Sequence, residues 1–240
     1  MELDPGTVAI VQLAWSRLLG LDDTALGDGG TDRLYRVDDD AVVLTFVTLF
    51  GREALRGPAW AVDAARGLSG PELRGHSTLL ALSREHGGRG LGEAQLYFCD
   101  ELPVIEGPEA VVSTDGSEVR DLEQLCPPDD VGEAGLGALG HTFVLLEEDT
   151  ASSTPRAPLA GAGYEIWEGI LAHLAVLTPP ERRRQGHAQR IAAVAVEEAM
   201  AAGLVPQWRA RTDNTASQRT ARRAGFAFAG TQTSVALQRD

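Results

Sequence analysis

The sequence feature that most constrains the fold is an apolar strand that passes into a helix through a short basic turn. Residues 170–178 have the apolar character of a strand, and Pro179 and Pro180 end it because proline cannot donate to a strand ladder. A helix is predicted from about 186 to 202. The first N–H groups of such a helix have no intrahelical partner, so this junction favours an anion such as a pyrophosphate.

The turn between strand and helix carries the residue types that anion binding requires. Gly186 and Ala188 are small, so phosphate oxygens can approach the backbone. Arg182, Arg183 and Arg184 add positive charge beside the helix dipole. A glycine turn alone is a weak indication, whereas strand, two prolines, basic turn, small residues and helix in this order form a stronger one.

A second glycine-containing run, residues 87–92, is an internal control for this interpretation. It also holds a Gly-x-Gly pattern with an arginine, Arg89. A helix is predicted before it, over about 71–86, and a strand after it, over Ala94–Cys99. No helix N-terminus then faces the run, so we interpret it as a plain connector.

Charge is distributed unevenly along the chain. The net charge of −14 argues against a nucleic-acid partner, which requires a basic face. Residues 1–180 hold 11 arginines and 30 acidic residues, whereas residues 181–240 hold 10 arginines and 5 acidic residues. A basic segment on an acidic chain fits a polyanionic ligand at that end, with a chance cluster of solvated arginines as the alternative. All 21 basic residues are arginine, which excludes lysine Schiff-base chemistry and a Walker A loop.

The cysteines and the apolar runs indicate in which cellular compartment the protein is expected. Cys99 and Cys126 lie in unrelated segments without metal-site spacing, so we expect reduced thiols, no metal and a cytoplasmic protein. The first five residues are acidic where a signal peptide would be basic. No apolar run approaches the roughly 18–20 residues that span a bilayer, so no membrane partner is predicted.

Two motifs after residue 170 resemble those of one enzyme superfamily. Residues 172–180 followed by Arg183-x-x-Gly186-x-Ala188 resemble motif A of the GNAT superfamily of N-acetyltransferases. Residues 214–217, followed by residues 221–226, resemble its motif B, and the intervening strand at 205–212 falls where a fifth strand is expected. The resemblance is specific over 159–240, reaches back to about residue 110 and is absent from residues 1–105.

The resemblance implies an acyl-CoA site. In GNAT enzymes the pantetheine arm lies where the fourth and fifth strands splay apart, and the N–H groups of residues 184–189 would cradle the pyrophosphate. Asn214 and Ser217 would meet the pantetheine or the sulfur, although Asn214 also fits a helix N-cap. The implied cosubstrate-binding residues are Val176, Leu177, Thr178, Arg183, Arg184, Gln185, Gly186, His187, Ala188, Gln189, Asn214 and Ser217.

The implied reaction is direct attack of an amine on the acetyl thioester. It requires a backbone N–H at the oxyanion, a general base and a proton for the thiolate. The candidate bases are His173, Glu165 and Glu168, and the alternatives are a buried hydrogen-bonded histidine and solvated turn carboxylates. Many relatives carry a tyrosine as acid seven residues after the motif B asparagine. In this sequence that position is Ala221, so the usual proton donor for the thiolate is missing. Its absence affects the expected catalysis more than the expected binding of acyl-CoA.

A change in character at residues 101–109 sets the predicted domain boundary. Residues 1–105 form an α+β domain of unclear role, and residues 106–240 form the GNAT-like transferase domain. The first domain completes the acceptor pocket, is a degenerate GNAT repeat or only dimerises. The predicted fold class is α/β (α+β): a GNAT-like mixed, mostly antiparallel twisted sheet flanked by helices, preceded by a smaller α+β domain. Residues 149–158 are predicted to be an exposed hairpin loop.

The predicted function is that of an acyl-CoA-dependent N-acyltransferase that moves acetyl from acetyl-CoA to a primary amine of a small molecule or peptide. The acidic balance outside residues 181–240 favours a cationic acceptor. One alternative is a non-catalytic acyl-CoA-binding or regulatory module, because the tyrosine is missing. Another is a tandem transferase acting on a larger substrate, with residues 1–105 as the decayed repeat. A homodimer is left open.

Overall fold

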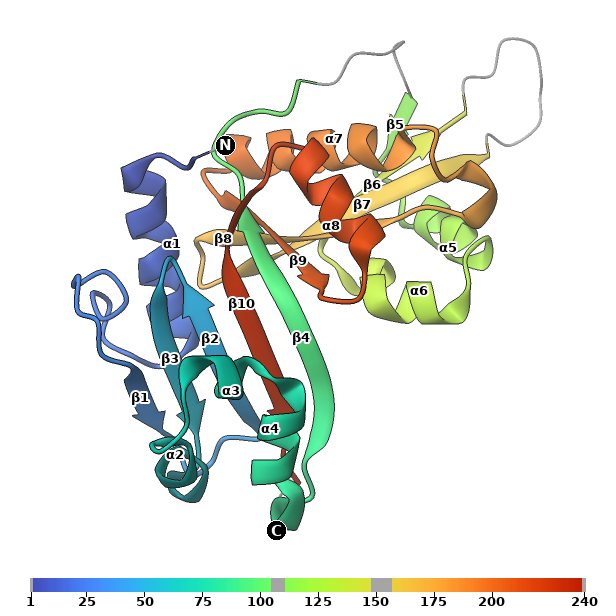
Figure 1. Cartoon of the computed structure of the whole chain (residues 1–240). Helices are drawn as coiled ribbons and strands as arrows, with labels where there is room; N and C mark the ends of the chain where they lie inside the picture. Colours follow the sequence, from blue (N-terminus) through green and yellow to red (C-terminus); the bar gives the residue numbers. More distant parts are fainter. Residues whose placement is uncertain (1, 105–110, 148–156, 239–240) are drawn as a thin grey trace. The chain divides into compact units, whose positions relative to one another are not determined.

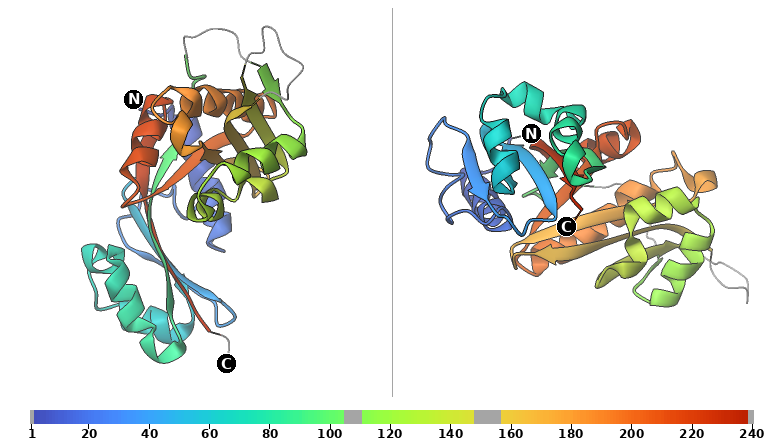
Figure 2. Two further views of the ribbon diagram at one scale, coloured as in Figure 1. Left: turned by 90° about the vertical axis from the view of Figure 1, so that its right-hand side faces the viewer. Right: turned by 90° about the horizontal axis from the view of Figure 1, so that it is seen from below.

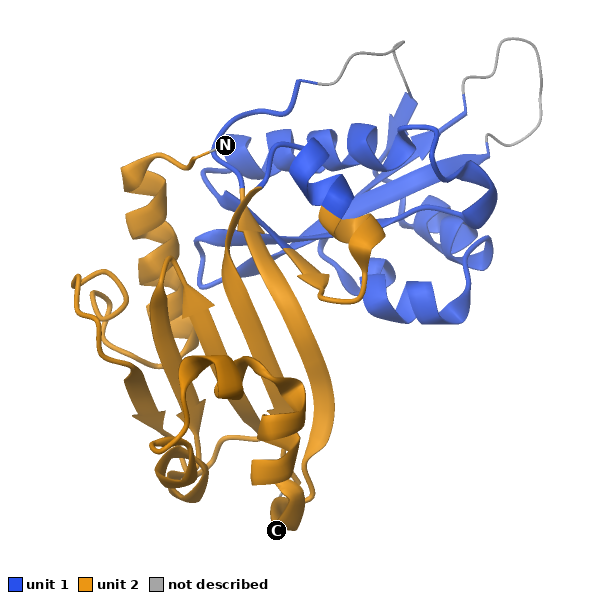
Figure 3. Cartoon of the chain, viewed as in Figure 1, with its two compact units in different colours: residues 1, 99–208, 219–226 blue, residues 2–98, 209–218, 227–240 orange. Residues whose placement is uncertain are grey.

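The computed structural model describes residues 2–104, 111–147 and 157–238 (Figure 1). Contacts divide the chain into two compact units (Figure 3). Unit 1 consists of residues 99–208 and 219–226, and unit 2 consists of residues 2–98, 209–218 and 227–240.

Unit 2 is built on five strands. Their spatial order is β1 (Leu34–Val37), β3 (Arg52–Gly57), β2 (Val43–Leu49), β10 (Ala227–Ala236) and β4 (Arg89–Phe98). β1 runs parallel to β3, and the other neighbours are antiparallel. Phe50 and Gly51 join β2 to β3 with φ values of 47° and 82°, the left-handed conformation that two-residue hairpins need. The last strand in sequence therefore lies between two strands of the N-terminal part.

Four helices cover the strands of unit 2. They are α1 (Pro5–Leu18), α2 (Ala59–Ala65), α3 (Gly70–Arg74) and α4 (His76–Leu82), followed by the 3-10 turn η1 (Arg84–His86). Leu44, Phe46 and Leu55 of the strands are buried in one cluster with apolar residues of α2, α3 and α4. The next residue, Arg56, points to the opposite face and donates to the Leu18 carbonyl of α1 at 3.3 Å.

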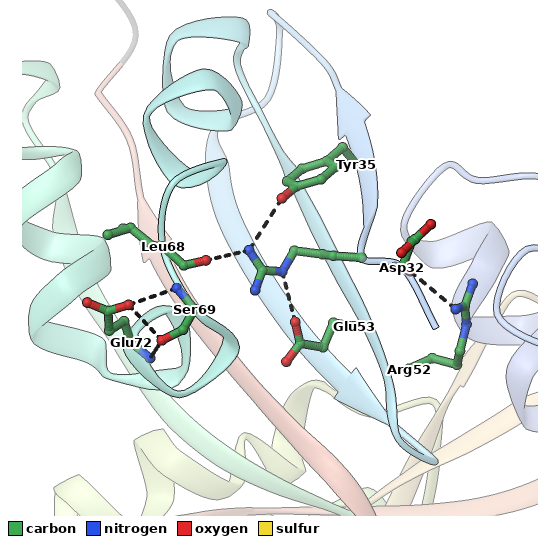
Figure 4. A network of polar contacts seen from close by, with 8 residues as sticks. Asp32, Tyr35, Arg52, Glu53, Leu68, Ser69 and Glu72 are labelled. Carbon is green, nitrogen blue, oxygen red and sulfur yellow. Dashed lines mark hydrogen bonds and ion pairs between the residues drawn. The ribbon is translucent and has the colours of Figure 1, made fainter. Parts of the chain in front are cut away.

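A network of polar contacts in unit 2 includes Glu53, Leu68, Ser69 and Glu72, which Figure 4 labels. Arg33, whose side chain is 12% exposed, lies 2.8 Å from the Glu53 carboxylate and also donates to the Leu68 carbonyl oxygen at 2.8 Å. Next to it, Ser69 and Glu72 form a capping box at the start of α3. A partly buried charge is stabilised by such partners, which come from segments distant in sequence. The network therefore has a structural explanation.

The described residues of unit 1 form the other five strands. Their order is β9 (Val205–Arg211, of which residues 205–208 belong to this unit), β8 (Leu171–Leu177), β7 (Pro158–Trp167), β6 (His141–Leu146) and β5 (Val111–Ser113). β8 and β9 are parallel, and the other pairs are antiparallel. Both units are thus mixed and mostly antiparallel, so the predicted fold class is confirmed.

Helices cover both faces of the unit 1 strands (Figures 1 and 2). α7 (His187–Ala201) packs on one face through Ile191, Ala195 and Ala199, which recur every four residues. α5 (Gly116–Gln124), α6 (Pro128–Ala134) and the 3-10 turn η2 (Leu136–Ala138) are on the other face. Gly161 lies under this layer, where a Cβ atom would meet Leu122 at 2.5 Å. The remaining elements are η3 (Pro180–Arg182) and α8 (Thr215–Arg223).

The structure refines several predicted elements. The strand expected from Ala94 begins at Arg89, so residues 90–92 belong to β4, and β3 was not predicted at all. The predicted boundary between residues 105 and 106, and most of the loop predicted at 149–158, lie outside the described residues. The domain division therefore stays a prediction. The structure groups β10 with the N-terminal strands in unit 2.

Candidate functional site

The site begins at a strand edge that loses one of its neighbours. β8 pairs with β7 along its length, up to Leu177 opposite Gly161. Its parallel pairing with β9 runs only from Leu171 opposite Val205 to Leu174 opposite Trp208. Beyond this last pair, residues 175–177 have a single neighbouring strand among the described residues. Backbone groups on that edge can therefore pair with the amides of an extended ligand.

The turn after β8 presents a run of backbone donors. Gly186, at φ 85°, is the N-cap of α7 and leaves the helix start without a side-chain cap. Arg184 also has a positive φ, at 64°. In the described part of the chain, no acceptor pairs with the backbone N–H groups of residues 184–188. The N–H of Gln189 is bonded inside the turn, to the Gly186 carbonyl at 3.1 Å.

Unpaired donors of this kind are what the predicted anion site requires. Backbone N–H groups converging at a helix start carry partial positive charge and cost nothing to reorganise. The space beside Gly186 is open: no described atom lies within 4 Å of the position that a Cβ atom would take there. The arrangement matches the predicted pyrophosphate turn in its helix start and in its small residues.

The three arginines of the turn differ in what they contact. The Arg182 guanidinium lies 3.6 Å from the Glu147 carboxylate. Arg183 lies 2.5 Å from the Asp130 carboxylate, and its Nε donates to the Thr178 carbonyl oxygen at 3.1 Å. Arg184 is exposed and has no acidic partner within the residues that the structure describes. Sequence reasoning treated the three side chains alike and did not find Asp130, because α6 lies far from the turn in sequence.

His187 stands at the first position of α7. Its Nε2 lies 3.3 Å from the Gln185 Oε1, and its Nδ1 is buried without a partner in the described residues. Burial, followed by the nearby charges of Arg190 and Arg182, lowers the pKa of His187 below its ordinary value of 6.5. The ring is therefore neutral at pH 7 and adds no charge to the turn.

The candidate bases His173 and Glu165 lie on one face, as directly opposed residues of β8 and β7. The His173 ring stacks on Trp167 with centroids 4.1 Å apart, and Trp167 donates to the Glu165 carboxylate at 3.1 Å. Glu168 is exposed at the β7–β8 turn and makes no polar contact with these three in the structure as described. The structure thus brings two of the three candidates together.

Gln207, which is fully buried, was not predicted. Its Nε2 lies 3.1 Å from the His173 Nδ1, and the two residues face each other across β8 and β9. An amide nitrogen only donates, so in this orientation Nδ1 accepts and the neutral ring carries its proton on Nε2. His173 can then accept a proton only if the Gln207 amide turns its oxygen toward Nδ1. Its role as base stays a prediction with this condition attached.

Motif B lies on and before α8. The Asn214 Oδ1 accepts from the Ser217 backbone N–H at 3.0 Å, so Asn214 caps this helix. Ligand contact by either residue stays a prediction. Ala221, two turns along, is fully buried, so a tyrosine there would have to displace its neighbours.

The two cysteine thiols are candidate nucleophiles, and the cysteine, histidine and acidic side chains are candidate metal ligands. Burial raises the pKa of both thiols, Cys99 and Cys126, to about 11, so neither is a thiolate nucleophile at neutral pH. Within residues 2–104, 111–147 and 157–238, no group of His, Cys, Asp and Glu side chains could hold a metal ion. No helix in the same ranges is long and apolar enough to cross a membrane.

An open strand edge followed by a turn of backbone donors is the arrangement that an extended, phosphate-bearing ligand would need. Residues 167–234 match the profile of the GNAT acetyltransferase family, and this range contains β8, the turn, α7, β9, α8 and most of β10. The predicted resemblance is confirmed for these residues. No curated protein matches the sequence.

Solved structures with a similar fold include a GNAT-family acetyltransferase from Colwellia psychrerythraea, at 15% identity and a TM-score of 0.46, over 66% of this chain and 60% of that one. A GCN5-related N-acetyltransferase from Kribbella flavida has 20% identity and a TM-score of 0.48, over 68% and 64%. A protein from Salmonella typhimurium, solved with its cofactor acetyl-CoA, has 14% identity and a TM-score of 0.37, over 55% and 96%. The chain spans less than two thirds of the length of the first two. Because these TM-scores are below 0.5, the family resemblance is based on the profile match.

Proposed function

We propose that this protein is an acyl-CoA-dependent N-acetyltransferase that transfers acetyl from acetyl-CoA to a primary amine of a small molecule or peptide. The single observation that carries the proposal is the run of unpaired backbone N–H groups over residues 184–188, directly after a strand edge that has lost one neighbour. The acidic composition of residues 1–180 favours a cationic acceptor.

Acetyl-CoA would supply the acetyl group on a thioester. The unpaired edge of residues 175–177 would pair with the pantetheine amides, and the N–H groups of residues 184–188 would hold the pyrophosphate. Arg184, whose guanidinium has no acidic partner in the described residues, would add charge at the turn. The backbone thus fixes the ligand at both ends of its arm, which places the thioester with little loss of freedom during reaction.

In the transfer, the amine nitrogen bonds to the acetyl carbon and the carbon–sulfur bond breaks, with its electron pair going to sulfur. The acceptor ammonium must first lose a proton, and Glu165 or His173 would receive it directly or through water. The nitrogen gives up its second proton as the carbon–sulfur bond breaks, and solvent carries a proton to the thiolate, because Ala221 offers no phenol. This scheme requires one titratable group on the protein instead of two.

A non-catalytic acyl-CoA-binding module is the second candidate, and two observations favour it. Ala221 is buried where relatives carry a tyrosine, and the Gln207 amide as oriented occupies the ring nitrogen that His173 would need to free. Such a module would keep every backbone contact to coenzyme A and lose the proton transfers.

Two measurements separate these candidates. Calorimetry with acetyl-CoA and with free coenzyme A tests binding, and absence of binding to both would refute both. Thiol release from acetyl-CoA against a panel of amines then tests transfer. An amine-dependent rate above background hydrolysis supports the enzyme, whereas tight binding with background rates for every amine class supports the module.

A further inference from the structure

Arg183, which belongs to the turn, contacts both the end of β8 and the helix α6. Its Nε donates to the Thr178 carbonyl oxygen at the end of β8, and its terminal nitrogen lies 2.5 Å from Asp130 in the first turn of α6. The guanidinium therefore ties strand, turn and α6 together. The Asp130 carboxylate is 38% exposed and the Arg183 side chain 46% exposed.

We propose that Asp130 is a positioning residue for the coenzyme A pyrophosphate: by holding Arg183 against the end of β8, it fixes the turn whose N–H groups receive the phosphates. This inference rests on the proposed function, because it assumes that the turn binds coenzyme A. It assigns Arg183 a different role from the one predicted from sequence. Its side chain orients the turn, and the neighbouring Arg184 supplies the charge.

The contacts of the turn support this division. Arg183 is extended, with φ −70° and ψ 157°, and Arg184 directly after it adopts φ 64°. A side chain other than glycine occupies this left-handed conformation at a cost of about 1–2 kcal/mol, so surrounding contacts must hold the backbone there. The Arg183 contacts are adjacent to that residue and have the geometry to do so.

Asp130 has two opposing effects on a bound anion. Its negative charge repels the pyrophosphate through space, so removing it strengthens binding by charge alone. Its hold on Arg183 orders the turn, so removing it also weakens binding. The chain offers a control for the first effect: Asp129 is in the same helical turn, is exposed and contacts no polar group of the described residues.

Loss of Asp130 should not unfold the protein. Ion pairs between side chains as exposed as these contribute only about 0–1 kcal/mol to global stability. A thermal-unfolding midpoint close to that of the wild-type chain is therefore expected for Asp130→Ala, as for Asp129→Ala. The effect on ligand affinity is then local.

The test measures coenzyme A affinity by calorimetry for Asp129→Ala, Asp130→Ala, Arg183→Ala and the Asp130→Ala/Arg183→Ala double variant. We expect Asp129→Ala to bind as tightly as the wild type or slightly more tightly, and Asp130→Ala to bind about three- to fivefold more weakly, the most that an ion pair this exposed can contribute. The double variant should bind no more weakly than Arg183→Ala alone, a coupling of at least about threefold.

Three outcomes would count against this inference. If Asp130→Ala binds coenzyme A more tightly, as Asp129→Ala is expected to, then Asp130 acts only through its charge and does not position the turn. Independent losses from Asp130→Ala and Arg183→Ala would mean that Arg183 meets the ligand itself. A midpoint that falls well below that of Asp129→Ala would make the effect one of general stability. If the wild-type chain binds no coenzyme A, the proposed function fails, which is a different result from these three.

Discussion

Two runs of glycine and arginine in this chain have similar composition and different structures. Residues 182–188 leave a strand and enter α7, with Gly186 at φ 85°, whereas residues 87–92 enter β4, with Gly92 at φ 99°. Within β4, Gly90 and Gly92 face Val235 and Ser234 of β10 in a strand ladder. Among the described residues, the N–H groups of residues 184–188 have no such partner. An anion site therefore depends on unpaired donors at a helix start, and glycine content alone does not predict it.

The sharpest test of this comparison replaces the matched glycines by glutamate. Both have a positive φ and open space at the Cβ position, so Gly186→Glu and Gly92→Glu introduce similar backbone strain. Only Gly186→Glu places a carboxylate among the predicted phosphate contacts. At about 4 Å and an effective dielectric of about 20 the repulsion is about 4 kcal/mol, on the order of a thousandfold in affinity.

Calorimetry with coenzyme A measures both variants, and thermal unfolding checks that they fold. We expect Gly92→Glu to bind like the wild type. Equal losses in the two variants would mean that strain, and not charge at the turn, controls binding. If Gly186→Glu binds normally, the turn is not the pyrophosphate site.

A smaller effect is expected from the arginines of the two runs. Arg184→Gly removes a charge that has no acidic partner in the described residues, so the affinity for coenzyme A should fall roughly two- to fivefold. The variant also removes the strain of a non-glycine residue at positive φ, so the free energy of unfolding should be unchanged or rise by up to about 1 kcal/mol. Arg89→Gly, in the other run, should leave affinity unchanged. The measurements are calorimetry at low and high salt, where the difference should shrink with salt, and urea unfolding.

The smallest expected effect concerns pH. Residues 87–92 contain no titratable histidine, whereas His187 in the other run has a pKa lowered by burial and by Arg190 and Arg182. The unfolded chain thus takes up this proton at a higher pH than the folded one, so stability is lost as pH falls from 6.5 through the lower folded value. His187→Gln should therefore lose less free energy of unfolding than the wild type between about pH 7.5 and pH 5.5. Urea unfolding at both values measures this, and an identical loss in both proteins would contradict it.

Local patterns predicted the elements of the site because they depend on residues close in sequence. The run from residue 170 to Gly203 contains the apolar strand, the proline stop, the small residues and the helical period, and the structure forms each where expected. Gly203, just after the end of α7, has a left-handed φ of 77°, the conformation in which glycine commonly ends a helix. The turn at Glu168 and Gly169 likewise has positive φ at both positions.

Contacts between distant segments were not predictable in the same way. Asp130 meets Arg183 across 53 positions, and Gln207 meets His173 across 34, and no periodicity in one strand or helix encodes either meeting. The placement of β10 is of the same kind. Residues 227–236 form a strand, but any strand with one buried face could have been its neighbour.

The position of β10 also has a consequence for synthesis on the ribosome. β10 pairs with both β2 and β4, so until residues 227–236 emerge those two strands have no strand between them. At about 5–20 residues per second, β4 waits on the order of ten seconds for its neighbour. During that interval the nascent chain exposes two unpaired strand edges, which are sites for aggregation or chaperone binding. The pairing of β2 and β4 through β10 is thus complete only when β10 has been synthesised.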